Sequence, residues 1–203
     1  MQEVYIFGAG GHARSLISLL KNSKFKILGI YDDSFNPEVK EFINSIEILG
    51  VLGSYNSSER IVLAYGDNHK RRKLFLNYLK NLHQETICHL MSFVDETASF
   101  GQSNLVFANV VINSNVKIGD NNIINTGAII EHEVEIGSHN HISVGSIICG
   151  RSSIGNNCFL GAGSVIIDKV KICDDVTIGA NSVVLKSIEE SGTYVGNPLR
   201  KIA

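Results

Sequence analysis

The second half of the chain repeats an aliphatic or aromatic residue at every sixth position. The series begins at Val94, ends at Val184 and has sixteen members, none of them polar. The members in between are Phe100, Val106, Ile112, Ile118, Ile124, Ile130, Ile136, Ile142, Ile148, Ile154, Leu160, Ile166, Ile172 and Ile178. A six-residue period matches neither the 3.6-residue period of a helix nor the two-residue alternation of an ordinary strand. It predicts a solenoid in which each hexapeptide forms one short parallel strand and one corner.

Small residues lie two positions before most of the later members of this series, as at Ala128, Ser146 and Ser164, and glycine follows several members. We expect the aliphatic and the small side chain to point inward and glycine or asparagine to occupy the strained corner. Three hexapeptides per coil would give about five triangular coils around one continuous apolar core. Because such coils close with short turns and no crossover helix, the rule that connections between parallel strands are right-handed need not hold, and hexapeptide solenoids are known left-handed exceptions. The sequence therefore predicts an all-β left-handed parallel β-helix.

The first half of the chain alternates short apolar runs with helical patterns. Apolar runs at 4–7, 26–31 and 61–65 predict strands, a run at 86–90 is a candidate fourth strand, and helices are expected at 13–21 and about 69–82. This order predicts an α/β, Rossmann-like βαβ domain at 1–90, followed by the β-helix domain at 91–203. Residues 36–58 show no clear pattern, and residues 192–198 are expected to form an extended tail.

Composition narrows the class of protein. The chain has 203 residues, 44% of them apolar, and a formal net charge of −2, which gives no reason to expect a nucleic-acid partner. No apolar run approaches the ~18 residues of a spanning helix, so no membrane insertion is expected, and the first residues lack the pattern of a signal peptide. The four cysteines form no C-x-x-C pair, which favours structural thiols in a reducing compartment. We expect a cytoplasmic protein.

A glycine-rich turn follows the first predicted strand. Gly8-x-Gly10-x-x-Ala13 fits the dinucleotide-binding fingerprint, and the acidic pair Asp32-Asp33 follows about twenty residues later. Glycine lets the backbone approach a pyrophosphate, and the following helix offers unpaired N–H groups. Because a second mononucleotide-binding half is missing, we favour a small nucleotide with a pyrophosphate over an oxidoreductase cofactor. A merely tight strand–helix turn is the alternative.

The corner after Ile130 carries the candidate catalytic group. In Glu131-His132-Glu133 a histidine has carboxylate neighbours that can fix its tautomer and raise its basicity. His139 and His141 follow and share parity on one predicted strand. His132 and His141 lie nine residues apart, half of an eighteen-residue coil, so we do not expect them to meet within one chain. A shared site would lie between subunits, and three faces suit a trimer. A surface salt link of His132, or a zinc site of the gamma-class carbonic anhydrase type, are alternatives.

Taken together, these motifs resemble a known family. The segment Gly8-Ala9-Gly10-Gly11-His12, the corner 131–133, His141 in His-Ile-Ser-Val-Gly, the run 157–161 and the tail 195–198 are similar to those of bacterial sugar acyltransferases with a left-handed β-helix. The chain most resembles the nucleotide-sugar N-acetyltransferases that act on UDP-4-amino-4,6-dideoxy sugars (the bacillosamine pathway) or GDP-perosamine. Sialic acid O-acetyltransferases are relatives. The resemblance covers nearly the whole chain and implies a homotrimer in surface polysaccharide biosynthesis or protein glycosylation.

The resemblance also implies roles for individual residues. His132 is similar to the family's general base, Glu133 to the acidic partner that orients it, and His141 to a second active-site histidine near the thioester. A nucleotide-sugar pocket is implied at Gly8, Gly10, Gly11, His12, Asp32, Asp33, Gly66 and Asn68. An acetyl-CoA groove between neighbouring solenoids is implied at His141, Gly150, Gly161, Ala162, Gly179, Ala180, Asn197 and Pro198. No metal is implied.

The expected reaction is direct transfer of acetyl from acetyl-CoA to a sugar amine, with His132 removing the proton as the C–N bond forms. Backbone N–H groups would stabilise the oxyanion. O-acetylation of a sialic acid or related sugar and a non-catalytic scaffold that binds a nucleotide sugar are the alternatives. The nucleotide, whether UDP, GDP or dTDP, stays open.

Overall fold

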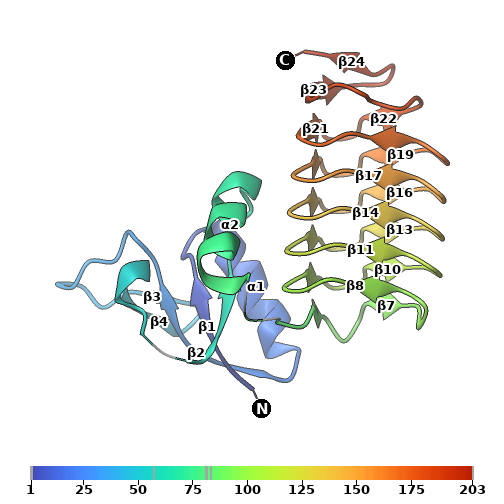
Figure 1. The fold of residues 1–203 in the computed structure, drawn as a ribbon. Coiled ribbons are helices and arrows are strands. Elements are labelled where there is room, and N and C mark those ends of the chain that lie inside the picture. Colours follow the sequence, from blue (N-terminus) through green and yellow to red (C-terminus); the bar gives the residue numbers. More distant parts are fainter. Residues whose placement is uncertain (1, 57, 81, 83, 203) are drawn as a thin grey trace. The chain divides into compact units, whose positions relative to one another are not determined.

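The computed structural model describes residues 2–56, 58–80, 82 and 84–202. The chain divides into two compact units, Met1–Gln84 and Glu85–Ala203, whose elements are labelled in Figure 1. The sequence suggested a boundary at 90/91. The structure divides earlier because the run at 86–90 contains β6 (Ile87–Cys88), which pairs in parallel with a strand of the β-helix. The expectation of a fourth strand in the first domain was therefore wrong.

The N-terminal unit is an α/β fold, as predicted. Its sheet has the order β3-β4-β2-β1-β5. The strands are β1 (Gln2–Phe7), β2 (Phe25–Tyr31), β3 (Phe42–Ile43), β4 (Ile46–Gly50) and β5 (Arg60–Leu63). All neighbours pair in parallel except β3 and β4. The helices are α1 (Gly11–Lys21), the 3₁₀-helix η1 (Leu52–Ser54), α2 (Asn68–Leu74) and the π-helix η2 (Phe75–Leu79).

The sequence predicted two parts of this unit less accurately. The unpatterned stretch 36–58 forms the β3–β4 hairpin and η1, with residue 57 outside the described residues. The helix expected at 69–82 begins at Asn68 and continues from Phe75 as η2 to Leu79, and residue 81 of that range is also outside the described residues. Packing holds both helical segments, because Leu52 of η1 and Phe75 and Leu79 of η2 are buried in the same cluster as Phe7.

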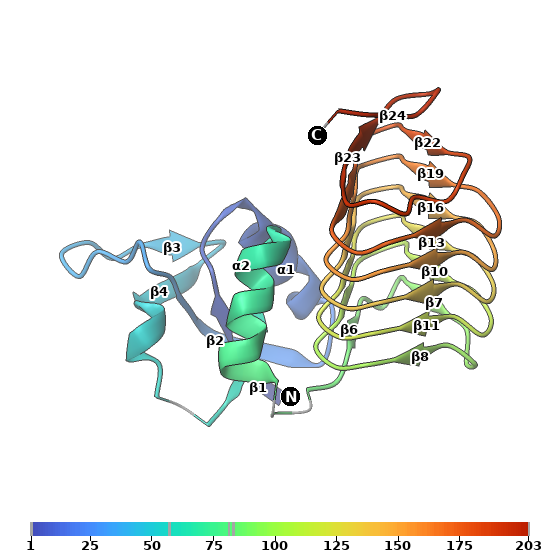
Figure 2. The same ribbon diagram turned by 45° about the horizontal axis from the view of Figure 1, so that its top comes forward.

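The C-terminal unit is a parallel β-helix with three faces (Figures 1 and 2). The β7 face consists of β7 (Phe93–Val94), β10 (Val111–Ile112), β13 (Ile129–Ile130), β16 (Ile147–Ile148), β19 (Val165–Ile166) and β22 (Val183–Val184). The β8 face consists of β8 (Ser99–Phe100), β11 (Lys117–Ile118), β14 (Glu135–Ile136), β17 (Ser153–Ile154) and β20 (Lys171–Ile172). The β6 face consists of β6, β9 (Leu105–Val106), β12 (Ile123–Ile124), β15 (His141–Ile142), β18 (Phe159–Leu160), β21 (Val176–Ile178), β23 (Gly192–Val195) and β24 (Arg200–Lys201).

The six-residue repeat is confirmed strand by strand. Every member of the apolar series is the last residue of one of these strands, and all members from Val106 to Val184 are buried. Stacked strands pair residues eighteen positions apart, as in Ile130 with Ile148. The small residues two positions earlier, such as Ala128 and Ser164, are buried beside them. The apolar series therefore forms the continuous core that the pattern predicted.

Every corner of the β-helix from Ser103 to Asn181 contains one residue with positive φ. At the corner between the β6 and β7 faces this residue is usually Gly or Asn, as at Gly127 (φ 69°) and Asn181 (φ 53°). At the β7–β8 corner it is Asn115, Glu133, Arg151 or Lys169 on successive coils. The left-handed conformation disfavours side chains other than Gly, Asn and Asp. A charged residue at such a corner therefore needs an explanation beyond backbone preference.

Buried asparagines form a ladder inside the β-helix at the β8–β6 corner. The Asn122 backbone N–H and side-chain Nδ2 donate to Asn104 Oδ1 at 2.8 and 3.0 Å, and Nδ2 also donates to the Gly137 carbonyl at 2.9 Å. Asn122 Oδ1 accepts the Asn140 N–H at 2.8 Å. The ladder ends where Asn140 Oδ1 accepts the Cys158 N–H. These amides satisfy the backbone at a corner that no water reaches.

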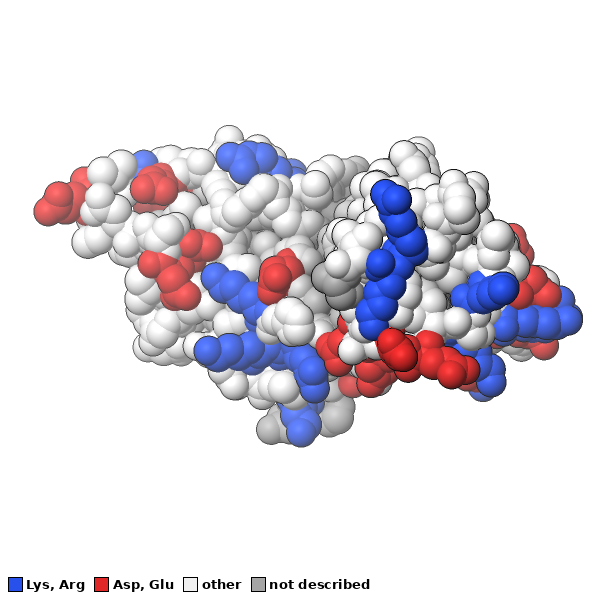
Figure 3. All heavy atoms as spheres, turned by 90° about the horizontal axis from the view of Figure 1, so that it is seen from above, with Lys and Arg blue, Asp and Glu red and all other residues white. Residues whose placement is uncertain are grey.

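The repeat ends in the sequence at Val184, but the β-helix continues. Ile188 bridges to Ile172, and β23 pairs in parallel with β21 before β24 turns back. The predicted extended tail thus contains β23, the last parallel strand of the β6 face. Basic and acidic side chains lie side by side at this end (Figure 3), and Lys201 pairs with Glu190 at 3.1 Å. None of the described helices is long and apolar enough to span a membrane.

Candidate functional site

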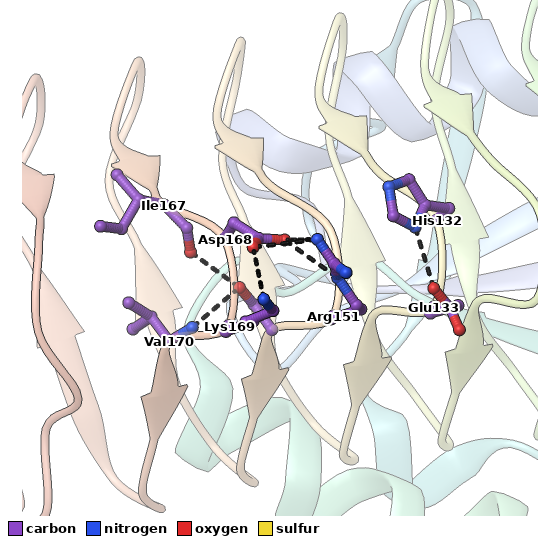
Figure 4. Close-up of polar contacts among 8 residues, drawn as sticks. His132, Glu133, Arg151, Ile167, Asp168, Lys169 and Val170 are labelled. Carbon is purple, nitrogen blue, oxygen red and sulfur yellow. Dashed lines mark hydrogen bonds and ion pairs between the residues drawn. The ribbon is translucent and has the colours of Figure 1, made fainter.

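The corner after β13 presents a paired imidazole and carboxylate. His132 Nδ1 lies 3.1 Å from Glu133 Oε2, and the two side chains are 46% and 57% exposed (Figure 4). Glu133 has φ 59°, the left-handed conformation of this corner series. Because Glu133 occupies Nδ1, the Nε2 nitrogen is the one that can accept a proton. The pair can therefore act as a general base that is accessible to a ligand.

The His132 ring lies against a glycine of the next coil. A Cβ atom on Gly150 would be 2.7 Å from His132 Cε1 and 2.8 Å from Nε2. Gly150 does not have positive φ, so backbone freedom is not the reason for glycine here. The missing side chain provides the space that the imidazole occupies. The coils are further connected by the Arg151 N–H, which donates to the His132 carbonyl at 3.0 Å.

Charged side chains continue on the coils beyond His132. Arg151 Nη2 donates to both Asp168 oxygens at 3.0 Å, and Lys169 Nζ lies 3.8 Å from Asp168 Oδ2 (Figure 4). Cys149 begins the corner that contains Arg151. Burial, with the charges of Glu131 and Asp168, raises the pKa of its thiol.

The other thiols are no better nucleophiles. All four cysteines are free. Burial raises the pKa of Cys88 to about 11 and that of Cys158 to about 12. Burial is also the main cause that raises the pKa of Cys173. Because the thiolate is the reactive form of cysteine, none of these groups is activated for covalent catalysis at neutral pH.

His141 lies on a different face from His132. It is the first residue of β15, buried on the β6 face, where its Nε2 is 3.2 Å from Asn125 Nδ2 and its ring meets Phe159 edge-on at 5.2 Å. The sequence predicted His139 on the same strand as His141, but the structure places His139 outside β15. It is a positive-φ corner residue with Asn121 Nδ2 at 2.9 Å from its Nδ1. The separation of His132 and His141 within one chain agrees with the sequence argument.

The remaining residues implied for a cofactor groove fall on the β6–β7 corner and the tail. Ala162 and Ala180 are exposed on successive coils, and Asn197 and Pro198 are exposed and joined by a cis peptide. A Cβ on Gly161 would be 2.6 Å from the Ala180 nitrogen, and one on Gly179 would be 2.7 Å from Val195 Cγ1. Close stacking of the coils therefore explains both glycines without a ligand.

The N-terminal unit contains a separate cavity of about 370 Å³. It is lined by Ala9, Gly10, Gly11, His12, Asp32, Ser34, Ala64, Tyr65, Gly66 and Lys70. Five of the residues implied for the nucleotide-sugar pocket are thus together here. A Cβ on Gly10 or Gly11 would meet no atom within 4 Å, so the start of α1 is open.

The other three implied residues do not line this cavity. Gly8, with φ 109°, packs beneath the Tyr65 ring, where an added Cβ would be 3.0 Å from ring carbons. Asp33 Oδ1 accepts the Leu52 N–H at 3.4 Å. Asn68 is buried and accepts from Arg71 Nη2 at 2.8 Å. These residues support the walls of the cavity.

Asp32 connects two loops at the mouth of the cavity. Its Oδ2 accepts the Ala9 N–H at 2.7 Å, and its Oδ1 accepts from the backbone and hydroxyl of Ser34. Burial raises the pKa of Asp32, but the hydrogen bonds from Ser34 and Ala9 and the charge of Lys70 outweigh it and hold the pKa below its ordinary value. Asp32 is therefore a carboxylate at neutral pH.

Five residues of the cavity wall were not among the implied pocket residues: Ala9, Ser34, Ala64, Tyr65 and Lys70. Lys70 Nζ lies 4.3 Å from the centre of the Tyr65 ring. Burial, with the charges of Asp32 and Asp33, raises the pKa of Tyr65. Its hydroxyl is buried and has no hydrogen-bond partner among the residues that the structure describes. A predicted helix beginning near residue 69 placed Lys70 in its first turn, and this was the available signal.

A second concavity lies elsewhere. A groove of about 740 Å³ follows the β8 face over Gly101, Gly119, Gly137 and Gly155, and none of the implied site residues lines it. Among the described residues, no three His, Cys, Asp or Glu side chains are grouped as metal ligands.

Comparison with known proteins gives two domain matches. Residues 3–78 match the PglD N-terminal domain, and residues 151–186 match the bacterial transferase hexapeptide (six repeats). A region of 105 residues is 30% identical to the uncharacterized protein L142 of Acanthamoeba polyphaga mimivirus. This region is 51% of the present chain and spans only 21% of the viral protein.

Solved structures share the fold over the whole chain. PerB from Caulobacter crescentus, in complex with CoA and GDP-perosamine, is 28% identical, with a TM-score of 0.89 over 100% of this chain and 98% of that one. The acetyltransferase domain of PglB from Neisseria gonorrhoeae FA1090, in complex with acetyl coenzyme A, is 25% identical, with a TM-score of 0.89 over 99% of both chains. The chain thus combines a PglD-type N-terminal domain with bacterial transferase hexapeptide repeats, and over its whole length it is similar in fold to solved sugar N-acetyltransferases.

Proposed function

We propose that this protein is an acetyl-CoA-dependent N-acetyltransferase whose acceptor is the amino group of a nucleotide-linked amino-deoxy sugar. The observation that carries the proposal is the His132–Glu133 pair, half exposed at a β-helix corner. It stands in a chain with the fold of an enzyme solved with CoA and GDP-perosamine. The acceptor is a UDP- or GDP-4-amino-4,6-dideoxy sugar.

The chemistry follows from the pair. A sugar amine attacks a thioester only when unprotonated, and a base near neutrality can remove its proton as the C–N bond forms. With Glu133 on Nδ1, His132 Nε2 takes that proton, and the thiolate of CoA leaves. Because burial keeps the cysteine thiols protonated, acetyl passes directly from CoA to the amine, without an acyl-enzyme.

The N-terminal cavity is the proposed nucleotide site. Gly10 and Gly11 leave open space before α1, and the start of a helix presents backbone N–H groups. Such a helix start favours an anion, here the diphosphate. The helix has no acidic residue in its first turn to compete for this position.

The outer surface of the β-helix supports a homotrimer. Outward positions of the β7 face are all apolar: Phe93, Val111, Ile129, Ile147, Val165 and Val183. Outward positions of the β8 face are all polar: Ser99, Lys117, Glu135, Ser153 and Lys171. A continuous apolar column on a protein surface marks a protein–protein interface. We propose that the β7 face packs against two further copies.

This packing would complete the active site. One edge of the β7 face is the corner with His132 and Gly150, and the other edge is the corner with Gly161, Ala162 and Ala180. Three-fold symmetry about the β7 faces brings the first edge of one copy to the second edge of the next. The residues that the resemblance implies for catalysis and for acetyl-CoA, which one chain holds apart, would then line one groove.

The test is release of free CoA from acetyl-CoA in the presence of UDP-, GDP- and dTDP-linked amino sugars, with sialic acid as a hydroxyl acceptor. We expect release with an amine. His132→Ala should lower kcat by ~10²–10⁴-fold, while acetyl-CoA still binds in calorimetry. Normal turnover by His132→Ala would remove the base assignment. Release with sialic acid and with no amine would contradict the choice of acceptor.

A further inference from the structure

The proposed nucleotide cavity needs positive charge. A nucleoside diphosphate sugar carries two negative charges at its diphosphate, and the cavity wall already includes the Asp32 carboxylate. The open start of α1 supplies N–H groups but only a partial charge. Lys70 is the one lysine or arginine among the ten residues that line the cavity.

Local structure fixes the backbone of Lys70. Asp67 caps α2, and its Oδ1 accepts the Lys70 N–H at 2.7 Å. The side chain of Lys70 is exposed, and no carboxylate in the described part of the chain lies within ion-pair distance of it. Its Nζ lies instead over the Tyr65 ring. A cation above the face of a phenol ring is held by a modest attraction, so an anion can displace it from the ring.

The ring under Lys70 is firmly placed. The buried Arg71 guanidinium donates to the Tyr65 carbonyl at 3.1 Å and to the Gly66 carbonyl at 3.4 Å. Gly8 packs against the same ring, where an added Cβ would be 3.0 Å from ring carbons. The wall formed by residues 65–67 therefore has little freedom, and the Lys70 side chain is its movable part.

We propose, on the basis of the nucleotide-sugar function above, that Lys70 is a diphosphate-binding residue that rests on the Tyr65 ring while the cavity is empty. When the ligand enters, Nζ leaves the ring and pairs with a diphosphate oxygen beside the start of α1. A charge-assisted hydrogen bond to phosphate is stronger than the cation–π contact it replaces. The side chain thus stays close to the site without an ion pair that the ligand would first have to break.

The experiment compares UDP and GDP with uridine and guanosine by titration calorimetry on the full chain. The Lys70→Met variant keeps a stem of similar length but loses the charge. We expect it to weaken binding of the preferred diphosphate by roughly 10- to 100-fold, the range of one hydrogen bond to a charged group. Nucleoside affinity should be unchanged. Lys73→Met is the matched control, because Lys73 is exposed on the same helix and does not line the cavity.

Two further measurements separate a binding role from a structural one. In turnover assays, Lys70→Met should raise KM for the nucleotide sugar and leave kcat and KM for acetyl-CoA unchanged. In ¹³C NMR spectra, the Lys70 methylene signals should lose their ring-current shift when UDP or GDP is added. Equal diphosphate affinity in wild type and Lys70→Met overturns the inference alone. Wild-type protein that binds neither diphosphate overturns the proposed function as well.

Discussion

The contact between His132 and Gly150 gives the sharpest test of the catalytic role proposed for the corner at residues 131–133. The perturbation is a single methyl group, Gly150→Ala. Its Cβ would lie 2.7 Å from His132 Cε1, so the ring must retreat by about 0.7 Å to restore an ordinary contact of 3.4 Å. The ring is half exposed and can move at small energetic cost. The fold should therefore tolerate the substitution.

The expected effect is on the chemical step. A base must lie within hydrogen-bond distance of the proton it removes, and a misplacement of about 1 Å can cost ~10²-fold. We expect Gly150→Ala to lower kcat by a factor approaching 10², with acetyl-CoA affinity and melting temperature close to wild type. The assay is steady-state release of free CoA, with calorimetry for acetyl-CoA and thermal unfolding on the same samples.

A second glycine provides the control. In Gly137→Ala the new Cβ would be 2.6 Å from the Gly155 carbonyl oxygen, which is backbone and cannot move aside as a ring can. We expect this variant to lose about 1–3 kcal/mol of stability. The reasoning is refuted if Gly150→Ala keeps the wild-type kcat while His132→Ala does not. It also fails if Gly150→Ala only raises KM for acetyl-CoA, since this would make Gly150 a cofactor contact.

Three further outcomes are expected. Asn122→Ala removes three buried hydrogen bonds of the asparagine ladder, so urea unfolding should show a loss of ~2–4 kcal/mol, whereas exposed Asn156→Ala should lose less than ~1 kcal/mol. Folding lowers the pKa of Asp32 below 3.8, so its stabilisation is complete above that value and disappears as the pH falls through the folded-state pKa. Unfolding followed from about pH 6 to about pH 2 should therefore lose less stability in Asp32→Asn. Ile147→Glu on the apolar β7 face should convert a trimer to monomers in light scattering, and Ser153→Glu on the polar β8 face should not.

The sequence predicted the β-helix in detail because each six-residue repeat corresponds to one strand and one corner of a coil. One side chain in six must enter the core of each coil, and a polar residue there would be buried without a partner. The same logic drew attention to Glu131-His132-Glu133, although the structure shows that Arg151 and Lys169 also place charged residues at the positive-φ position of this corner. The β3–β4 hairpin had no such periodic requirement. It is held by contacts with strands distant in sequence, such as Leu49 against Gly29.

The cavity residues were harder to predict for a similar reason. Gly10 and Asp32 belong to a known spacing. Tyr65 and Lys70 line the cavity only because β5 lies beside β1 and Asp67 caps the start of α2. Nothing in the local sequence around Lys70 distinguishes it from Lys73 three positions later. Only the tertiary arrangement shows that Lys70, and not Lys73, lines the cavity.

Glycine occurs in this β-helix for three different structural reasons. These reasons decide which positions can be substituted to test the proposed acetyl-CoA groove. Gly127 provides positive φ, Gly150 makes room for an imidazole, and Gly161 allows the next coil to approach. Loss of activity in Gly161→Ala would follow from disturbed stacking whether or not acetyl-CoA binds there. Ala162 and Ala180 are exposed on the same corner, so a larger side chain there fills the groove and leaves the coils intact. If Ala162→Leu and Ala180→Leu retain both stability and acetyl-CoA affinity, the groove does not follow this corner, and the argument for a site between copies loses one of its two edges.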